Sequence, residues 1–370
     1  MKLWVRGRGG RYGSAAFRWA RLLAGRRRPG LRIFYGHDRV PAPGDPVAGG
    51  TAKFQKLARR FPNRPTDFTL LYLGSTWLPR DLGPLLALAR RRRIPVVLNQ
   101  TGVSYPAWAG DRYAAFNRPI RQALLAADHV LYQSEFCKRS ADRFVAEPRG
   151  SWEILPNAVD VERFTPAPAP PPGGPVLLLG GDQTQAYRLE LGLRTFATLL
   201  PRHPDARLLV TGRSAVPIEP LVAELGLDGR VEVAGRYAQR DAPALFRRAH
   251  LLLHTKVNDP CPTVVLEAMA CGLPVVHPAS GGLPELVANE AGLGAPHPVS
   301  YDRDEPPAAE ALADAADHVL SQLDGYREAA RRRAVEHYAL GPWLDRHAEL
   351  FERLTTGRRA AQVRERRPAR

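Results

Sequence analysis

The sequence has few cysteines and no long apolar run. The three cysteines, Cys137, Cys261 and Cys271, are odd in number, and none belongs to a C-x-x-C pair. This argues against a disulfide framework and a structural zinc site, and it favours the reducing cytoplasm as the location. The longest apolar runs, such as residues 175–179, are only strand-length. A membrane-spanning helix needs about 18 apolar residues, so we expect none.

Acidic residues are absent from the first 34 positions, which hold ten Lys and Arg, and the last 16 hold six Arg and one Glu. The body between residues 35 and 354 has a net charge of only +1, although the whole chain has +16. A domain that is basic over its whole surface is therefore excluded, and two basic ends, residues 1–31 and 355–370, flank a nearly neutral body. Arg18 and Arg21 interrupt the apolar stretch of a signal peptide, so we expect no secretion signal.

Strand-length apolar runs alternate with helical patterns, such as residues 81–93 and 188–200. The runs are continuous, as expected for strands that are covered on both faces. Candidate strands span residues 32–37, 68–74, 95–100, 129–134, 176–181, 207–212, 231–235, 251–255 and 274–279. This alternation predicts an α/β protein with parallel sheets and right-handed crossovers.

A proline-rich segment, residues 166–175, divides the chain. It cannot join a helix or a central strand, because proline lacks an N–H donor and has a fixed φ. We interpret it as a semi-rigid linker between two Rossmann-like domains, residues 32–165 and 176–335. A long loop within one domain is the alternative, but a new candidate strand begins directly after the segment.

The most informative segment is residues 258–287. An apolar strand leads into a polar loop with Asp259, and a helix then begins near Pro262 and Thr263, where proline suits the first turn and threonine can cap it. The N–H groups from Thr263 to Val265 would point out of the carboxyl edge of the sheet. A helix N-terminus at that edge favours a phosphate or a diphosphate.

Two carboxylates flank this predicted phosphate site. Asp259 precedes the helix, and Glu267 lies in its second turn, eight positions later. Carboxylates accept hydrogen bonds from sugar hydroxyls, so the pair fits a ligand with hydroxyl groups on both sides of a phosphate bridge, namely a nucleotide-sugar. On spacing alone, a helix cap and a solvated surface glutamate are the commoner explanation.

The segment resembles the signature of family-4 glycosyltransferases, which is an acidic residue, seven residues and a glutamate. EAMACGLPVV, SGGLPELV, LPNAVDVERFTP and GHDRVPAPGDPVAGGTAKFQKLA also match the usual text of that family. The resemblance covers residues 32–354. It implies a retaining enzyme of the GT-B fold, with two Rossmann-like domains that face a central crevice. Helices at residues 336–354 would cross back to the first domain, which would be the acceptor side.

The resemblance also implies roles for individual residues of the second, donor-binding domain. Glu267 would hold the ribose hydroxyls of the donor, and Asp259 would hold the hydroxyls of the transferred sugar. The backbone at Pro262, Thr263 and Val264 would bind the sugar and the diphosphate.

In the first domain, Gly49 and Gly50 match the family's glycine-rich loop. The absence of a Cβ there would let the main chain approach the donor phosphate and the acceptor, and a plain turn is the alternative. Asn157 and Asp160 lie in the hinge text, where a structural role is favoured over a catalytic one.

Several positions depart from the family pattern. Asp259 is usually Glu, so the carboxylate is one methylene shorter here. Leu191 stands where the family has a Lys that neutralises the diphosphate. A leaving diphosphate needs preorganised positive charge, and the candidates are Arg188, Arg213 and Lys256. For each cation, a solvated surface charge is the alternative.

The first domain also departs from the pattern at the end of the candidate strand 95–100. Many family members have His there, whereas this sequence has Asn99 and Gln100. His37 is a candidate for the crevice, although a structural role explains it equally well. A non-catalytic GT-B protein that binds a nucleotide-sugar or acts as a scaffold is therefore an alternative, which the retention of both carboxylates opposes.

The resemblance implies transfer with retention at the anomeric carbon, from a nucleoside-diphosphate sugar to a glycan, lipid-linked or small-molecule acceptor. The acceptor would attack from the face that the diphosphate leaves, and domain closure would accompany donor binding. We expect no metal and no other cofactor. Asp302 and Asp304 resemble a metal-binding D-x-D motif, but their polar loop is typical of a surface.

The basic N-terminal end has two further interpretations. On a helical plot, residues 14–28 place Trp19 and small apolar residues opposite Arg18 and Arg21, which suits an anionic membrane surface at the inner leaflet. A disordered extension is the alternative. Residues 6–13 resemble a short RGG segment that would bind nucleic acid, but one copy without an RNA-binding domain does not favour that function.

Overall fold

The structure is a computed structural model that describes residues 19–20, 22, 29–42, 45 and 49–365. The RGG-like segment at 6–13 and most of the predicted amphipathic helix at 14–28 lie outside the described residues. Trp19, which the helical plot assigned to a membrane-facing arc, instead donates from its indole Nε1 to Asp81 at 2.9 Å. Leu22 is buried in the core of the first domain.

The first half of the chain forms a sheet of five parallel strands that neighbour one another in chain order. All residues of the second, third and fourth strands are buried, as their continuous apolar runs predicted. The strands are β1 (Ile33–Phe34), β2 (Leu70–Gly74), β3 (Val96–Gln100), β4 (His129–Tyr132) and β5 (Ser151–Ile154).

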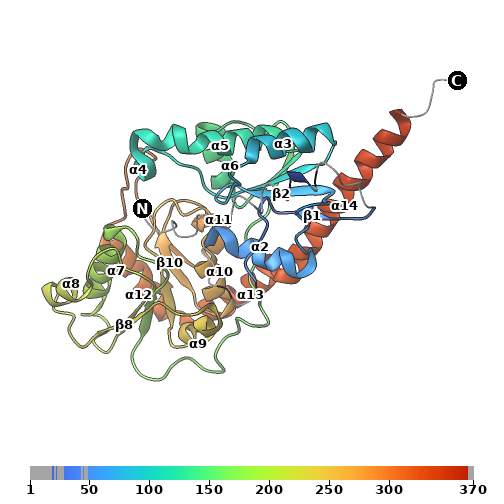
Figure 1. Ribbon diagram of the computed structural model, residues 1–370. Helices are drawn as coiled ribbons and strands as arrows, with labels where there is room; N and C mark the ends of the chain where they lie inside the picture. The colour runs from blue at the N-terminus through green and yellow to red at the C-terminus, as the bar shows by residue number, and fades with distance from the viewer. Residues whose placement is uncertain (1–18, 21, 23–28, 43–44, 46–48, 366–370) are drawn as a thin grey trace.

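Helices cover both faces of this sheet. The helices of the first domain are α2 (Gly49–Arg60), α3 (Leu82–Arg91), α4 (Pro106–Ala109), the 3₁₀ turn η1 (Gly110–Arg112), α5 (Tyr113–Ala126) and α6 (Glu135–Phe144). Figure 1 shows α3, α5 and α6 along one face, where their apolar side chains join one core cluster. Helix α2 packs on the other face together with the C-terminal helix.

The second half forms a sheet of six parallel strands in the order β11-β10-β9-β6-β7-β8. The strands are β6 (Val176–Leu179), β7 (Arg207–Thr211), β8 (Val231–Gly235), β9 (Leu251–Leu253), β10 (Val275–Pro278) and β11 (Gly292–Ala295). The chain winds outward from β6 to β8 and then returns to the other side of β6. The two parallel sheets confirm the predicted fold class.

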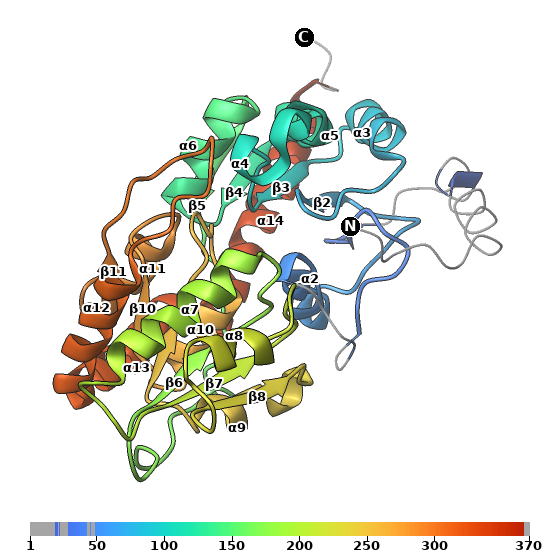
Figure 2. The ribbon, with the colours of Figure 1, turned by 90° about the vertical axis from the view of Figure 1, so that its left-hand side faces the viewer.

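The helices of this domain alternate with its strands (Figure 2). They are α7 (Ala186–Leu199), α8 (Glu219–Glu224), the 3₁₀ turn η2 (Gln239–Asp241), α9 (Ala242–Phe246), α10 (Thr263–Ala270), α11 (Leu283–Val287), α12 (Ala309–Ser321) and α13 (Leu323–Tyr338). Successive residues of β6, Leu177 and Leu178, belong to two different core clusters. The strand is therefore covered on both faces.

The chain then returns to the first domain through α14 (Leu340–Glu365). His347 lies 3.1 Å from the Tyr72 hydroxyl of β2, and Phe351 packs edge-on against the Tyr72 ring. Arg346 donates to Glu153 of β5 at 2.7 Å. These contacts attach α14 to the first sheet, as the family resemblance implied. Among the described residues, no helix has the length and apolar character that crossing a membrane requires.

The structure differs from the sequence prediction at the sheet edges. Strands β5 and β11 were not predicted, because SWEI is not a continuous apolar run and GLGA is rich in glycine. Strand β8 was predicted, but as an edge strand it is only partly covered. Hydrophobic continuity identifies interior strands, whereas edge strands need not be apolar.

Candidate functional site

The winding of the second sheet places its site at the carboxyl ends of β6 and β9. These neighbouring strands are the point where the strand order reverses, and ligands of open α/β sheets bind at such a switch point. The loop after β6 begins with Gly180, where a Cβ would lie 2.8 Å from Leu252 and 3.2 Å from Val264. Glycine therefore lets this loop approach the start of α10, the helix that follows β9.

Helix α10 begins at Thr263, and Pro262 occupies the position before it without a side-chain cap. Thr263 is thus the first helical residue, and the expectation that it caps the helix was wrong. The N–H of Val265 is also not free, because it donates to the Pro262 carbonyl at 3.2 Å. The N–H groups of Thr263 and Val264 belong to the first turn, where a helix supplies no acceptor of its own.

Asp259 lies among cations at this edge. Its Oδ2 is 3.3 Å from the Lys256 Nζ and 3.4 Å from the His254 Nε2, and the residue is only 9% exposed. Burial alone would raise the pKa of Asp259, but Lys256, His254 and the nearby Arg188 hold it well below its usual range. Burial lowers the pKa of His254, so its imidazole is neutral at pH 7. The Asp259 carboxylate is therefore a permanent anion.

The three candidate cations have different surroundings. Arg188, on α7, is 5% exposed, and it donates to the Asp182 carbonyl while its buried Nε has no partner within the described part of the chain. Arg213, after β7, is exposed, and its side chain makes two hydrogen bonds to the Asp182 carboxylate, at 2.9 and 2.6 Å. Arg188 and Lys256 both act on the Asp259 carboxylate, whereas Arg213 is paired with Asp182.

Glu267 is buried at 8% exposure in the second turn of α10. Burial raises its pKa to about 7, and Lys56, Arg163 and a hydrogen bond with Gln239 only partly oppose this effect. Its surroundings thus differ sharply from those of Asp259.

The first domain meets this edge at what we call the domain junction, the contact between residues 99–157 of the first domain and 256–285 of the second. The Asn157 side chain donates to the Cys261 carbonyl at 2.9 Å. The Glu285 carboxylate of α11 accepts the backbone N–H groups of Glu135 and Phe136, at 2.8 and 3.1 Å, at the start of α6. These bonds hold the carboxyl edges of the two sheets together.

Gly49 and Gly50 are the first two residues of α2 rather than a loop. A Cβ at Gly50 would lie 2.4 Å from the Thr76 Oγ1, so glycine is required there by a contact within the domain. His37 stacks on Trp77 with 3.8 Å between ring centroids. Its Nε2 lies 3.0 Å from the Trp77 carbonyl, which is a structural contact.

Sequence reasoning missed Lys53 of α2. Its side chain is 3% exposed and donates to Asn99 and, at 3.0 Å, to Thr101. The only signal in the sequence is its position next to Phe54 and four residues before Leu57, both of which are buried. A lysine on the apolar side of a helix normally lies at a boundary, so its complete burial was not expected.

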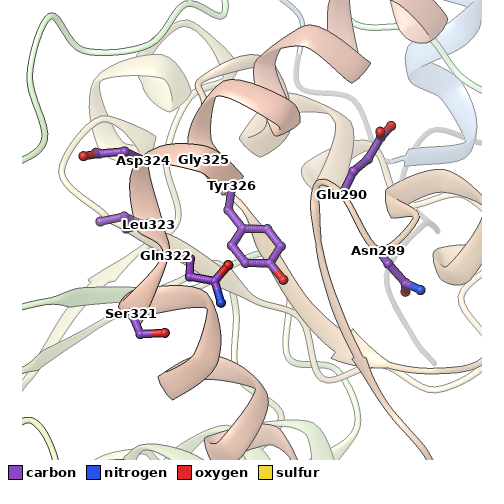
Figure 3. Close-up of a pocket in the computed structure, with 8 residues that line it drawn as sticks. All are labelled: Asn289, Glu290, Ser321, Gln322, Leu323, Asp324, Gly325 and Tyr326. Carbon is purple, nitrogen blue, oxygen red and sulfur yellow. The ribbon is translucent and has the colours of Figure 1, made fainter.

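Two further features complete the description of the second domain. Asp302 is exposed, whereas Asp304 accepts a hydrogen bond from Gln185 at 3.2 Å and interacts with Lys256, whose charge partly opposes the rise that burial causes in the pKa of Asp304. Within the described ranges, no cluster of three or more His, Cys, Asp or Glu could hold a metal ion. A pocket of about 480 Å³ lies between Asn289, Glu290 and residues 321–326 (Figure 3). Because Glu290 lies two residues before the start of β11, this pocket lies at the amino edge of the sheet, opposite Asp259.

Two parallel-sheet domains with a carboxylate-flanked helix at the switch point define a GT-B fold. Solved structures support this class. Sucrose-phosphate synthase from Thermosynechococcus elongatus aligns with a TM-score of 0.63 at 20% identity over 82% of this chain and 77% of that chain. HepE from Anabaena in complex with UDP aligns with a TM-score of 0.61 at 17% identity, covering 81% of both chains.

Sequence comparison agrees with this class. Residues 160–336, which make up most of the second domain, match the family model for glycosyl transferases group 1.

Curated relatives are similar over different lengths. The GDP-mannose-dependent alpha-(1-6)-phosphatidylinositol monomannoside mannosyltransferase of Mycolicibacterium smegmatis is 29% identical over 80% of this chain and 78% of its own length. The phosphatidylinositol N-acetylglucosaminyltransferase gpi3 subunit of Schizosaccharomyces pombe is 22% identical over 62% of this chain, which spans only 49% of that protein. The D-inositol 3-phosphate glycosyltransferase of Salinispora tropica is 32% identical over 49% of this chain and 43% of its own length. The chain thus spans about half of the length of several relatives.

Proposed function

We propose that this protein transfers a sugar from a nucleoside-diphosphate sugar to an acceptor hydroxyl. The observation that carries the proposal is the pair of buried carboxylates, Asp259 and Glu267, on either side of a helix N-terminus at the switch point. This arrangement offers hydrogen-bond acceptors on both sides of a diphosphate site.

Each group has a separate task in this proposal. The N–H groups of Thr263 and Val264 bind the diphosphate together with Lys256 and Arg188, which supply positive charge where negative charge develops on the leaving group. Glu267 accepts the ribose hydroxyls and Asp259 those of the transferred sugar. Since these cations come from the chain itself, the site needs no metal and no other cofactor.

We further propose retention at the anomeric carbon. Asp259 and Glu267 act by binding and orientation, so no covalent intermediate on the enzyme is required. The acceptor hydroxyl attacks from the face that the diphosphate leaves, and a phosphate oxygen receives its proton.

The acceptor is proposed to be lipid-linked or inositol-based. The names of several relatives support this class, since they specify phosphatidylinositol, D-inositol 3-phosphate and cellobiosyl-diphosphopolyprenol as acceptors. An enzyme that acts on such acceptors would work at the cytoplasmic face of an anionic membrane. Salt-sensitive binding of the full chain to anionic liposomes would support this location.

Substrate binding requires the domains to separate. Asp259 and Glu267 are each less than a tenth exposed, and the Glu285 bonds to the start of α6 hold the junction closed. We therefore propose that the donor binds an open form and that these contacts form again on closure.

Thermal unfolding with UDP, GDP and ADP tests the donor site. At least one nucleoside diphosphate is expected to raise the melting temperature, and Glu267→Ala should abolish the rise, because its carboxyl group accepts the ribose hydroxyls. Glu219→Ala, an exposed glutamate of α8, is the control and should respond like the parent. If no nucleoside diphosphate or nucleotide-sugar stabilises the protein, the proposal is wrong. Product formation from a donor panel then separates an enzyme from a non-catalytic binder.

A further inference from the structure

A buried cation that has no anionic partner, Lys53 of α2, contacts the domain junction at Asn99. The Lys53 ammonium donates to Asn99 Oδ1 and Thr101 Oγ1, which are both neutral, and within the described part of the chain it forms no ion pair. A buried charge is costly unless it is paired or fully hydrogen-bonded. An ammonium has three donors, so the two named bonds leave one for a further acceptor.

Hydrogen bonds that begin in the C-terminal helix α14 fix the orientation of the Asn99 amide, which accepts from Lys53. His347 donates from Nδ1 to the Trp343 carbonyl at 2.8 Å, so its Nε2 is the acceptor for the Tyr72 hydroxyl at 3.1 Å. The Tyr72 oxygen in turn accepts from Asn99 Nδ2 at 3.1 Å. The amide of Asn99 therefore presents its oxygen to Lys53, and α14 sets that orientation.

The same network leads to the start of α10. Gln133 Nε2 lies 3.2 Å from Asn99 Oδ1 and donates to Asn157 Oδ1 at 2.7 Å, and Asn157 Nδ2 donates to the Cys261 carbonyl. Cys261 lies two residues before Thr263. The Oε1 atoms of Gln133 and Gln100 are buried without a partner within the described residues. Lys53 is thus connected through Asn99, Gln133 and Asn157 to the residue that precedes Pro262, at the start of α10.

The electrostatic surroundings of Lys53 contain no carboxylate. Burial lowers the pKa of Lys53 to about 7, and the titratable groups that act on it are the thiols of Cys261 and Cys137 and the ammonium of Lys56. Burial raises the pKa of both thiols to about 12, so they are neutral. An anion that entered the junction would therefore be the first negative charge to reach this ammonium.

We propose that Lys53 is a substrate-binding residue whose ammonium pairs with a phosphoryl oxygen at the domain junction. The inference rests on the proposed function, and it adds a cation from the first domain to those of the second. A phosphoryl oxygen has the charge that Lys53 lacks, and a charge-assisted hydrogen bond to it is stronger than one to a neutral amide. The oxygen belongs either to the donor diphosphate or to a phosphate of the acceptor.

Two variants of the full chain test this inference. Lys53→Met removes the charge in a similar volume, and Lys53→Gln keeps an amide donor for Asn99 in case the methionine variant does not fold. Arg59→Met is the matched control, since it removes an exposed charge from the same helix. Without ligand, both Lys53 variants should melt at the same temperature as the parent or higher, because an unpaired buried charge is removed.

Calorimetric titration with the nucleoside diphosphate that binds the parent is the first arm. A loss of affinity of about tenfold or more in the Lys53 variants assigns the oxygen to the donor diphosphate. The second arm titrates inorganic phosphate into the protein saturated with that nucleotide. If the Lys53 variants bind the nucleotide like the parent but no longer bind the inorganic phosphate that the parent binds, the oxygen is assigned to an acceptor phosphate.

If the Lys53 variants match the parent and Arg59→Met in both arms, the inference is overturned. This outcome differs from failure of the proposed function, in which the parent itself would bind no nucleoside diphosphate or nucleotide-sugar.

Discussion

Asp259, before α10, and Glu267, in its second turn, are both less than a tenth exposed, yet they lie in opposite electrostatic surroundings. Lys256, His254 and Arg188 surround Asp259 and keep its pKa low, whereas burial dominates at Glu267 and raises its pKa to about 7. The comparison shows that the two carboxyl groups of one sequence motif differ in their charge at neutral pH, because their surroundings differ. Asp259 is an anion at every physiological pH, and Glu267 changes its charge within that range.

The largest effect is expected at Asp259. Asp259→Asn removes the anion but keeps the size of the side chain, so Lys256 and Arg188 lose their counter-charge and the sugar hydroxyls lose a charged acceptor. We expect kcat/KM for transfer to fall about 100- to 1000-fold. The free energy of unfolding should fall by about 3 kcal/mol, since a largely buried cation is left without compensation. Activity within fivefold of the parent would show that the charge of Asp259 is not used.

The pH dependence of stability should separate the two carboxylates. The folded pKa of Glu267 is raised from 4.5 to about 7, so the protonated form is favoured by folding. Relative to Glu267→Gln, the parent should therefore be equally stable below pH 4.5 and less stable by about 3 kcal/mol once the pH has risen above 7. Urea unfolding of both proteins between pH 5 and 8 measures this difference. Parallel curves would contradict the assigned surroundings of Glu267.

For Asp259, the pH dependence of the free energy of unfolding should have the opposite sign. Its folded pKa is lowered, so its contribution to stability is present above the unfolded value of 3.8 and is lost as the pH falls below that value. The same urea series should therefore show no effect of Asp259 between pH 5 and 8. This contrast serves as an internal control for Glu267.

The sequence predicted the second domain better than the first. Asp259, Glu267 and the start of α10 follow one another within a few residues, so local patterns place them on one helix and one loop. The role of Lys53 depends on Asn99, Gln133 and Asn157, which are up to a hundred residues away and meet only because parallel strands share a carboxyl edge. No local pattern predicts such contacts.

Contacts that are distant in sequence also explain why the surroundings of the three candidate cations could not be predicted. From the sequence, Arg188 was the candidate nearest to Leu191, and Arg213 and Lys256 were further candidates at neighbouring strand ends. Only the fold shows that Asp182 engages Arg213 while Arg188 lies buried near Asp259. The departure at Leu191 is thus compatible with a charged site, since other residues bring cations to the same edge.

Restoring the family's usual glutamate at position 259 should have the smallest effect. Asp259→Glu keeps the charge but adds a methylene beside His254, which is 1% exposed, so we expect a loss of stability of about 1 kcal/mol from crowding. Lys256 is 30% exposed in its side chain and can move outward with the longer carboxylate, so kcat/KM should stay within about threefold of the parent. Unfolding and kinetic measurements of Asp259→Glu and Asp259→Asn in parallel then separate the effect of the carboxylate's charge from the effect of its position. If Asp259→Glu loses as much activity as Asp259→Asn, the exact placement of the carboxylate against the transferred sugar matters more than its charge.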